Sequence, residues 1–439
     1  MKIVSKMALA IALGGMAMAA PAFAKKEDKA AAATSAEKAT PAVQKAAFDA
    51  QKAADAGDVA TALTNYNTAK AAMVNNTDKF MVGRVGYQIY QKNKDEALFS
   101  EVVDLMLASG EASVDAQKQL YFAQGQIAYN KKDYAKALTA FQGAEKAGST
   151  DADLVPLIIE SMALQGQTLL ALQTLNDEAT KHAAAGQVIP PEWYQRGVSI
   201  GYKNKNPGDQ AAINQLTLEL CLKWVASAPQ PQYWNGALEV YAQQFKLDNA
   251  GRLEMLRLLR AVGAMEGGDD YREYADDVYL RFPNEALTVL QEGGAKGKVN
   301  LTAKGDASDI MGIVKGKVAG DKASLPGADK ASRAAADGSA ALSTADAYVG
   351  YGDYAKAIDL YKVALAKGGA KVDPGTVNLH MGWALALSGD NAGAKTAFQA
   401  VTGARKPIAD FWLVHLDHPT VPNAAPAAPA AAPAAAPAK

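Results

Sequence analysis

The stretch 121–145 constrains the fold more than any other part of the chain. Its sequence is YFAQGQIAYNKKDYAKALTAFQGAE, which predicts two short helices joined by a polar turn. Ala137, Phe141 and Ala144 are spaced by four and then three residues, so they lie on one face of the second helix. A small–large–small face predicts close packing against the first helix, where Gly125 lets a neighbour approach. A single hairpin cannot bury this face alone, so we expect further copies of it.

Copies of this hairpin recur along the chain. Most begin with a Gly-Asp or Gly-Gln turn, and the second helix then repeats the four-then-three spacing. One alanine anchors each copy, and these anchors are separated by 35, 40 and 34 residues in the N-terminal group and by 37 in the C-terminal pair. The predicted anchors are Ala62, Ala97, Ala137, Ala171, Ala357 and Ala394.

A period near 34 residues with helix–turn–helix content resembles the tetratricopeptide repeat (TPR) family. The chain departs from the family pattern at the leading tryptophan, at the tyrosine of the first helix and at the closing proline. The resemblance implies an all-α fold, a right-handed superhelical solenoid of TPR-like helical hairpins; an ordinary helical bundle is the alternative. The residues that fit its repeat packing are Ala62, Tyr66, Gly125, Ala137, Phe141, Ala144, Ala357, Tyr361, Gly382, Ala394 and Phe398.

The composition agrees with closely packed helices. Hydrophobic residues make up 49% of the 439 residues but aromatics only 7%, so alanine supplies much of the apolar content. A formal net charge of −1 argues against a strongly basic nucleic-acid surface. The one cysteine excludes an intrachain disulfide and any multi-cysteine metal site.

Residues 1–24 have the pattern of a secretory signal peptide. Lys2 and Lys6 precede a short apolar run, and Ala22-Phe23-Ala24 ends it with small residues at the cleavage positions. The run is shorter than the roughly 20 residues that span a bilayer, although a retained anchor is the alternative. We therefore expect a periplasmic or secreted protein of a Gram-negative cell envelope, with no integral membrane span after cleavage.

Composition shifts divide the rest of the chain. A glycine- and lysine-rich segment interrupts the repeats, and it is either a pair of loosely packed helices or a hinge between two arrays. Alanine and proline alone form most of the C-terminal tail, which cannot build a core. The predicted parts are the flexible linker 25–40, the TPR-like array 41–292, the glycine- and lysine-rich segment 293–335, the C-terminal repeats 336–418 and the disordered tail 419–439.

Candidate catalytic and metal-binding residues are few. Ser199 stands in a G-x-S-x-G pattern, but the preceding residues open a helix instead of the strand that a nucleophile elbow needs. His415 and His418 are three residues apart without an evident third metal ligand. Cys221 shares an apolar stripe and is expected to be a buried, inert thiol. We therefore predict no enzyme activity, no metal and no cofactor.

Binding is the remaining function. In the TPR family, inward-pointing residues of the first helices line a concave surface. The resemblance therefore implies a groove for a protein or peptide partner, although packing against an adjacent helix is the alternative role for the same side chains. The alternative functions are an envelope structural protein that contacts the cell wall through its Ala/Pro tail and self-associates, and, least expected, a serine hydrolase. The groove residues carried over from the family are Phe122, Gln126, Tyr129, Asn130, Trp383 and Leu387.

Overall fold

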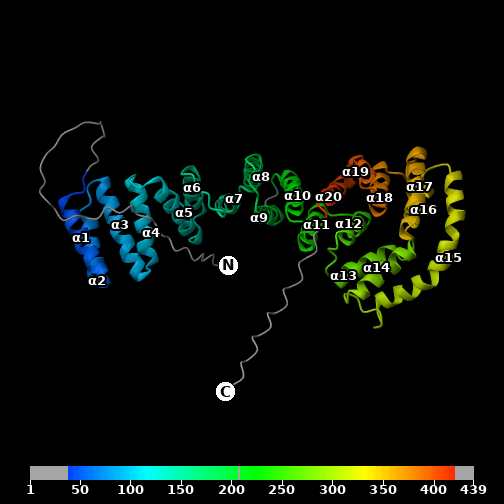
Figure 1. Ribbon diagram of the computed structural model, residues 1–439, viewed down its shortest axis with the longest axis horizontal. Coiled ribbons are helices and arrows are strands. Elements are labelled where there is room, and N and C mark those ends of the chain that lie inside the picture. The colour runs from blue at the N-terminus through cyan, green and yellow to red at the C-terminus, as the bar shows by residue number, and fades with distance from the viewer. Residues whose placement is uncertain (1–37, 206–207, 421–439) are drawn as a thin grey trace, which may run out of the picture. The chain divides into compact units, whose positions relative to one another are not determined.

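The computed structural model describes residues 38–205 and 208–420. Within these ranges the regular elements are twenty α-helices and one short 3-10 helix, which confirms the predicted all-α class (Figure 1). The predicted signal peptide, all but the end of the linker, and the Ala/Pro tail from residue 421 lie outside the described residues. No helix in the described part of the chain is both long and apolar enough to cross a membrane.

The helices divide into two compact units, the first ending at Lys181 and the second beginning at His182. The glycine- and lysine-rich segment 293–335, for which a helix pair and a hinge are the two predictions, lies within the second unit. The helices of the first unit are α1 (Pro41–Asp55), α2 (Val59–Ala71), α3 (Asn76–Asn93), α4 (Glu96–Ser109), α5 (Val114–Asn130), α6 (Tyr134–Lys146), α7 (Leu154–Leu164) and α8 (Thr168–Ala184).

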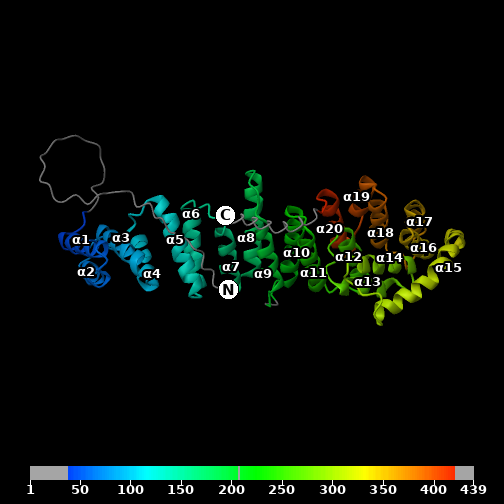
Figure 2. The ribbon, with the colours of Figure 1, turned by 60° about the horizontal axis from the view of Figure 1, so that its bottom comes forward.

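Helices of the first unit pack in sequential hairpins, α1 with α2, α3 with α4 and α5 with α6 (Figure 2). Each turn ends in an aspartate whose side chain accepts a hydrogen bond from a backbone N–H of the next helix, at Asp58, Asp95 and Asp133. Such a cap satisfies one of the free N–H groups of the helix start. The residue before each aspartate has a positive φ, and at Gly57 glycine adopts it without strain.

The α5–α6 hairpin is held by the predicted small–large contact. A Cβ added to Gly125 would lie 2.4 Å from Cε1 of Phe141, so only glycine lets this ring lie against α5. The same arrangement recurs in the second unit, where a Cβ on Gly382 would lie 2.6 Å from Phe398. All the residues assigned to repeat packing are buried.

The anchor predicted at Ala97 is wrong, because this side chain is exposed. In the neighbouring copies the anchor follows the capping aspartate by four residues, and the same offset from Asp95 leads to Phe99. Val103 and Met106, both fully buried, then occupy the places of the aromatic and the second alanine. The capping Asp95, and not the alanine that follows it, fixes the register of this helix.

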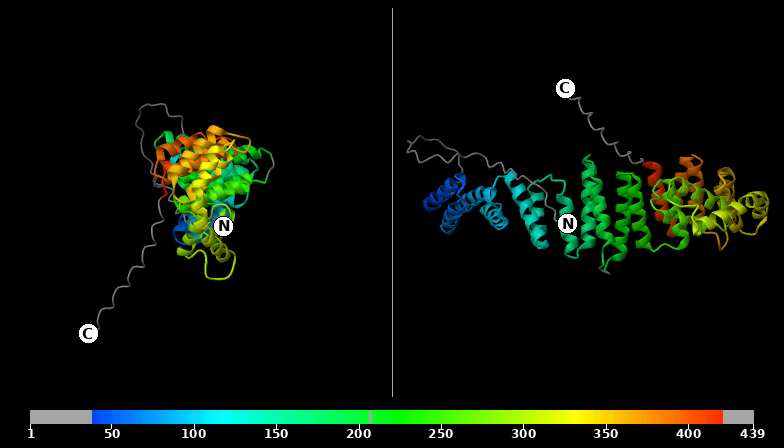
Figure 3. Two further views of the ribbon diagram at one scale, coloured as in Figure 1. Left: turned by 90° about the vertical axis from the view of Figure 1, so that its right-hand side faces the viewer. Right: turned by 90° about the horizontal axis from the view of Figure 1, so that it is seen from below.

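In the second unit, the last helix packs against helices from the early part of the same unit. Phe411 of α20 (Lys406–Asp417) packs against Trp234 and Tyr241 of α11 (Pro231–Phe245), with ring centroids 6.1 and 5.7 Å away. Helix α20 also contacts α10 and α12, and Figure 3 shows the red C-terminal helix beside the green ones. The helices of this unit are α9 (Pro191–Tyr202), α10 (Gln210–Ser227), α11 (Pro231–Phe245), α12 (Asn249–Ala261), α13 (Gly268–Val278), α14 (Pro283–Ala295), α15 (Asp306–Ala334), α16 (Ser339–Gly350), α17 (Tyr354–Lys367), α18 (Pro374–Leu387), α19 (Asn391–Gln399), the 3-10 helix η1 (Gly403–Arg405) and α20 (Lys406–Asp417).

Most of the glycine- and lysine-rich segment forms one long helix, α15, where the sequence predicts either a helix pair or a hinge. Buried Val314 and Leu325 anchor it to the unit, while much of its remaining surface is exposed. Its C-terminal end is capped from α17, where Nζ of Lys367 donates to the carbonyl of Arg333 at 2.7 Å. These tertiary contacts outweigh the weak helix propensity of glycine.

Candidate functional site

A cluster of charged side chains is buried in the interior of the second unit. Arg257 of α12 makes a bidentate pair with Glu285 of α14, with N–O distances of 2.9 and 3.0 Å. Both side chains are buried, at 4% and 2% exposed. Tyr274 of α13 donates its hydroxyl to the same carboxylate at 2.7 Å, so Glu285 accepts three hydrogen bonds from two buried side chains. A buried pair of this kind is tolerated because each group is both charge-balanced and hydrogen-bonded.

His380 of α18 extends this network. Its Nδ1 lies 2.7 Å from Asp346 of α16, and its Nε2 lies 3.4 Å from Glu254 of α12. Burial alone would lower the pKa of His380, but the two carboxylates outweigh burial and raise its pKa to about 9. The imidazole is therefore a cation at neutral pH, and Asp346, whose pKa is lowered by this partner despite burial, is a carboxylate. The Tyr361 hydroxyl donates to Asp346 at 2.7 Å.

Arg405 of η1 joins the C-terminal end of the unit to α12. Its Nε lies 3.0 Å from Glu254, and its Nη1 lies 3.2 Å from Asp248 at the start of the same helix. Residues that are about 150 positions apart in the chain are thus joined by ion pairs. The network fixes the register of α12 against α16, α18 and η1.

Two cavities lie on either side of Arg257. The larger has a volume of about 470 Å³ and is lined from α12, α13, α14, α16 and α18, with Trp383 and Leu387 in its wall. The smaller, about 370 Å³, is lined by His380 and by the exposed cations Arg281 and Lys371. The Arg257 guanidinium also lies over the Trp383 ring, 4.3 Å from its centroid, which is a cation–π contact.

Of the predicted groove residues, the structure brings Trp383 and Leu387 together at the larger cavity. Trp383 is largely buried under Arg257, whereas Leu387 is 41% exposed. That a partner binds there stays a prediction.

The predicted groove residues of α5 do not gather at a cavity. Phe122 is only 4% exposed and its ring packs 5.7 Å from that of Phe141, so it offers little surface to a partner. The Tyr129 ring contacts Tyr134, Gln126 is half-buried and Asn130 is exposed.

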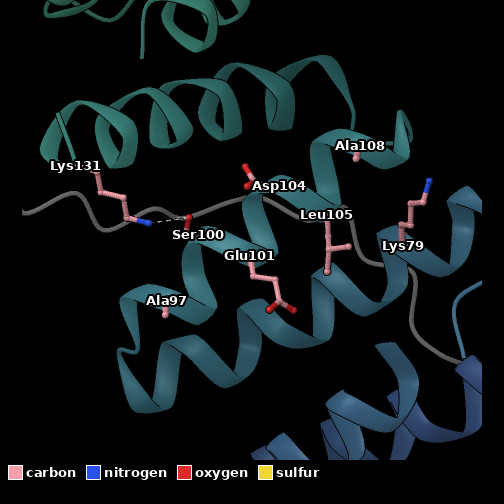
Figure 4. Close-up of a pocket in the computed structure, with 8 residues that line it drawn as sticks. All are labelled: Lys79, Ala97, Ser100, Glu101, Asp104, Leu105, Ala108 and Lys131. Atoms are coloured by element: carbon pink, nitrogen blue, oxygen red, sulfur yellow. Dashed lines mark hydrogen bonds between the residues drawn. The ribbon is translucent and has the colours of Figure 1, made fainter. Parts of the chain in front are cut away.

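The first unit has a hollow of about 520 Å³ over α4, with Lys79 of α3 and Lys131 after α5 at its sides (Figure 4). None of the four α5 groove residues lines it. Its two acids already have partners within the chain. Glu101 accepts from Lys70 at 2.7 Å, and Asp104 accepts from Lys136 at 3.1 Å. The hollow is thus a surface between adjacent repeats whose acids are already paired, and nothing in it singles out a ligand.

Ser199 is not at a nucleophile elbow. The whole 197–201 motif lies inside α9, so the sharp strand-to-helix turn that exposes a catalytic serine is absent there. His415 lies among the aromatic rings of Trp234 and Trp412, and burial lowers its pKa. Among the described residues no group of histidine, cysteine and acidic side chains could hold a metal ion. Cys221 is free and buried, and burial raises the pKa of its thiol.

The sequence pattern does not predict the buried network or the place of His380 in it. One signal was present in α12, where Glu254 and Arg257 stand among Met255, Leu256 and Leu258, all of them buried. Apolar residues on several sides of a helix indicate that it is buried. A charged side chain that is buried with them must have a partner. The identity of that partner, 28 residues away in sequence, could not be read from the local pattern.

Comparisons with known proteins name no family for this chain. No family model matches the sequence, and no curated protein matches it. Among solved structures, the chain is similar to one described as "Structure of Naa15/Naa10 bound to HypK-THB". The match has 13% sequence identity and a TM-score of 0.27, and it covers 85% of this chain and 67% of the other. At this TM-score the similarity carries no argument about function.

Proposed function

We propose that this protein is a non-enzymatic, exported scaffold that binds a protein or peptide partner in the cell envelope. In its helical hairpins small residues pack against large ones, as Gly125 does against Phe141. The repeat residues therefore have a structural role. The signal-peptide pattern of residues 1–24 supports export.

One observation carries the binding proposal. Trp383 and Leu387 stand on the first helix of a TPR-like hairpin, where the family resemblance expects partner-binding residues, and both line an open cavity of about 470 Å³. Leu387 remains 41% exposed, although leucine gains free energy from burial. A preformed cavity with apolar and aromatic side chains in its wall is the usual form of a binding site.

The proposal is tested by crosslinking in intact cells followed by mass spectrometry. We compare the wild-type chain with Leu387→Glu, which places a charge at the cavity, and with Leu280→Glu as the matched control. Leu280 is 64% exposed, belongs to the same unit and does not line the cavity. We expect a protein partner that is lost in the first variant and kept in the second. Recovery of no protein partner from wild-type cells would overturn the proposal.

A further inference from the structure

The ionised side chains that line the larger cavity are paired with each other. Arg257 pairs with Glu285, and Arg260 pairs with Glu292 at 2.8 Å. The lining therefore has two cations and two anions, each neutralised within the chain. A charged ligand would have to displace one of these pairs and leave its partner uncompensated, which is strongly unfavourable for buried groups.

Several neutral polar side chains of the lining also have partners within the chain. Tyr274 donates to Glu285 at 2.7 Å, Tyr351 donates to Asp321 at 2.7 Å, and Asn284 donates to a backbone carbonyl of α16 at 2.6 Å. A ligand that competes for these hydrogen bonds gains little, because each new bond replaces one already made.

The remaining lining combines apolar side chains with the Tyr354 phenol and the backbone of Gly350 and Gly352. It includes the Trp383 ring, the Leu387 side chain, Val349 and Ala261. These groups gain free energy whenever an apolar group covers them. The volume of about 470 Å³ lies within the range of known ligand sites, which is about 300–1,000 Å³.

From this lining we infer that the cavity takes an uncharged aliphatic or aromatic side chain of a partner peptide. The inference rests on the proposed function and names the chemistry of its site. The half-exposed Leu387 continues the apolar wall to the protein surface, where the peptide backbone would lie. The smaller cavity differs, because Arg281 and Lys371 are exposed there, and it would not select for an uncharged side chain.

The test uses four capped single amino acids as probes with the purified chain lacking residues 1–24. The apolar probes are N-acetyl-leucinamide and N-acetyl-tryptophanamide, and the charged ones are the corresponding aspartate and lysine derivatives. Binding is measured by ligand-observed NMR titration at millimolar concentration. We expect the apolar probes to bind at least about tenfold more tightly than the charged ones. We expect Leu387→Glu to weaken apolar binding by a similar factor and Leu280→Glu to leave it unchanged.

A photoreactive leucinamide then locates the site, with labelling expected in the peptides that contain Val349 and Leu387. Equal binding of charged and apolar probes, an unchanged affinity in Leu387→Glu, labelling elsewhere in the chain, or no binding of the apolar probes would each overturn the inference. Its failure is distinct from failure of the proposed function. If a partner is recovered in cells but its capture does not depend on Leu387, the scaffold proposal is supported and the cavity inference is wrong. If the apolar probes bind but no cellular partner is found, the cavity inference is supported and the scaffold proposal is wrong.

Discussion

The α5–α6 hairpin and the interior of the second unit are held together by opposite kinds of contact. In the hairpin, Phe141 lies on Gly125 with no polar atom between them. In the second unit, Arg257, Glu285 and His380 are buried and connected by ion pairs and hydrogen bonds. The hairpin joins residues 16 positions apart, whereas the His380–Glu254 contact joins residues 126 apart.

The two interiors differ in what determines which helices pack together. Apolar packing of small against large residues is local, and it can be repeated from one hairpin to the next. Buried ion pairs cost desolvation free energy and tolerate few arrangements, so they fix one register between helices that are distant in sequence. We expect the second unit to depend on single charges and the first unit to depend on side-chain volume.

The largest effect is expected at Arg257. Arg257→Met removes one partner of a buried pair and leaves Glu285 uncompensated, so the free energy of unfolding should fall by about 3–5 kcal/mol. All five tryptophans belong to the second unit, so tryptophan fluorescence during denaturation reports the loss. The double variant with Glu285→Leu should recover most of it. Equal instability of the single and double variants would contradict a role for the pair.

The next effect depends on pH. The pKa of His380 is raised from about 6.5 in an unfolded chain to about 9, so its stabilising contribution is complete below about pH 6.5. The contribution is lost as the pH rises through about 9, and it is on the order of 3 kcal/mol. Wild-type stability should therefore fall more steeply than that of His380→Gln between neutral pH and pH 9.5. Denaturation curves at several pH values measure the difference, and parallel profiles would rule it out.

The contrast also explains what the sequence could predict. The all-α class and the positions of Ala137, Phe141 and Gly125 followed from spacings within one hairpin. The anchor at Ala97 failed because the register depends on the capping Asp95. The interior network could not be predicted, since a charged residue in a helix carries no information about which distant helix supplies its partner. Trp383 and Leu387 were placed by family resemblance, and the cavity beside them was not foreseen.

A smaller effect should mark the first unit. Gly125→Ala places a methyl group 2.4 Å from the Phe141 ring, and overpacking should destabilise the hairpin by about 1–2 kcal/mol after the gain in helix propensity. Ala137→Leu should cost about 1–3 kcal/mol for the same reason. Circular dichroism should show the loss while the tryptophan transition stays in place. An unchanged unfolding profile in both variants would mean that the repeat packing is misassigned.

The smallest change in the free energy of unfolding is expected at Gly312, which is the matched control for Gly125→Ala. A Cβ added to Gly312 on α15 meets nothing within 4 Å, so Gly312→Ala should stabilise the helix by about 0.5–1 kcal/mol. The opposite signs of the two glycine-to-alanine changes separate close packing from backbone entropy. Denaturant titration followed by tryptophan fluorescence measures the Gly312 change, and destabilisation there would show that this face of α15 is covered in solution.

Our central proposal is that a protein partner binds at the larger cavity, beside Trp383 and Leu387 of α18. The most direct test places a photo-crosslinking amino acid at position 387 and, in a second strain, at position 280, and irradiates intact cells. We predict a discrete protein adduct at position 387 that is absent at position 280. The same adducts at both positions, or none at position 387, would contradict it.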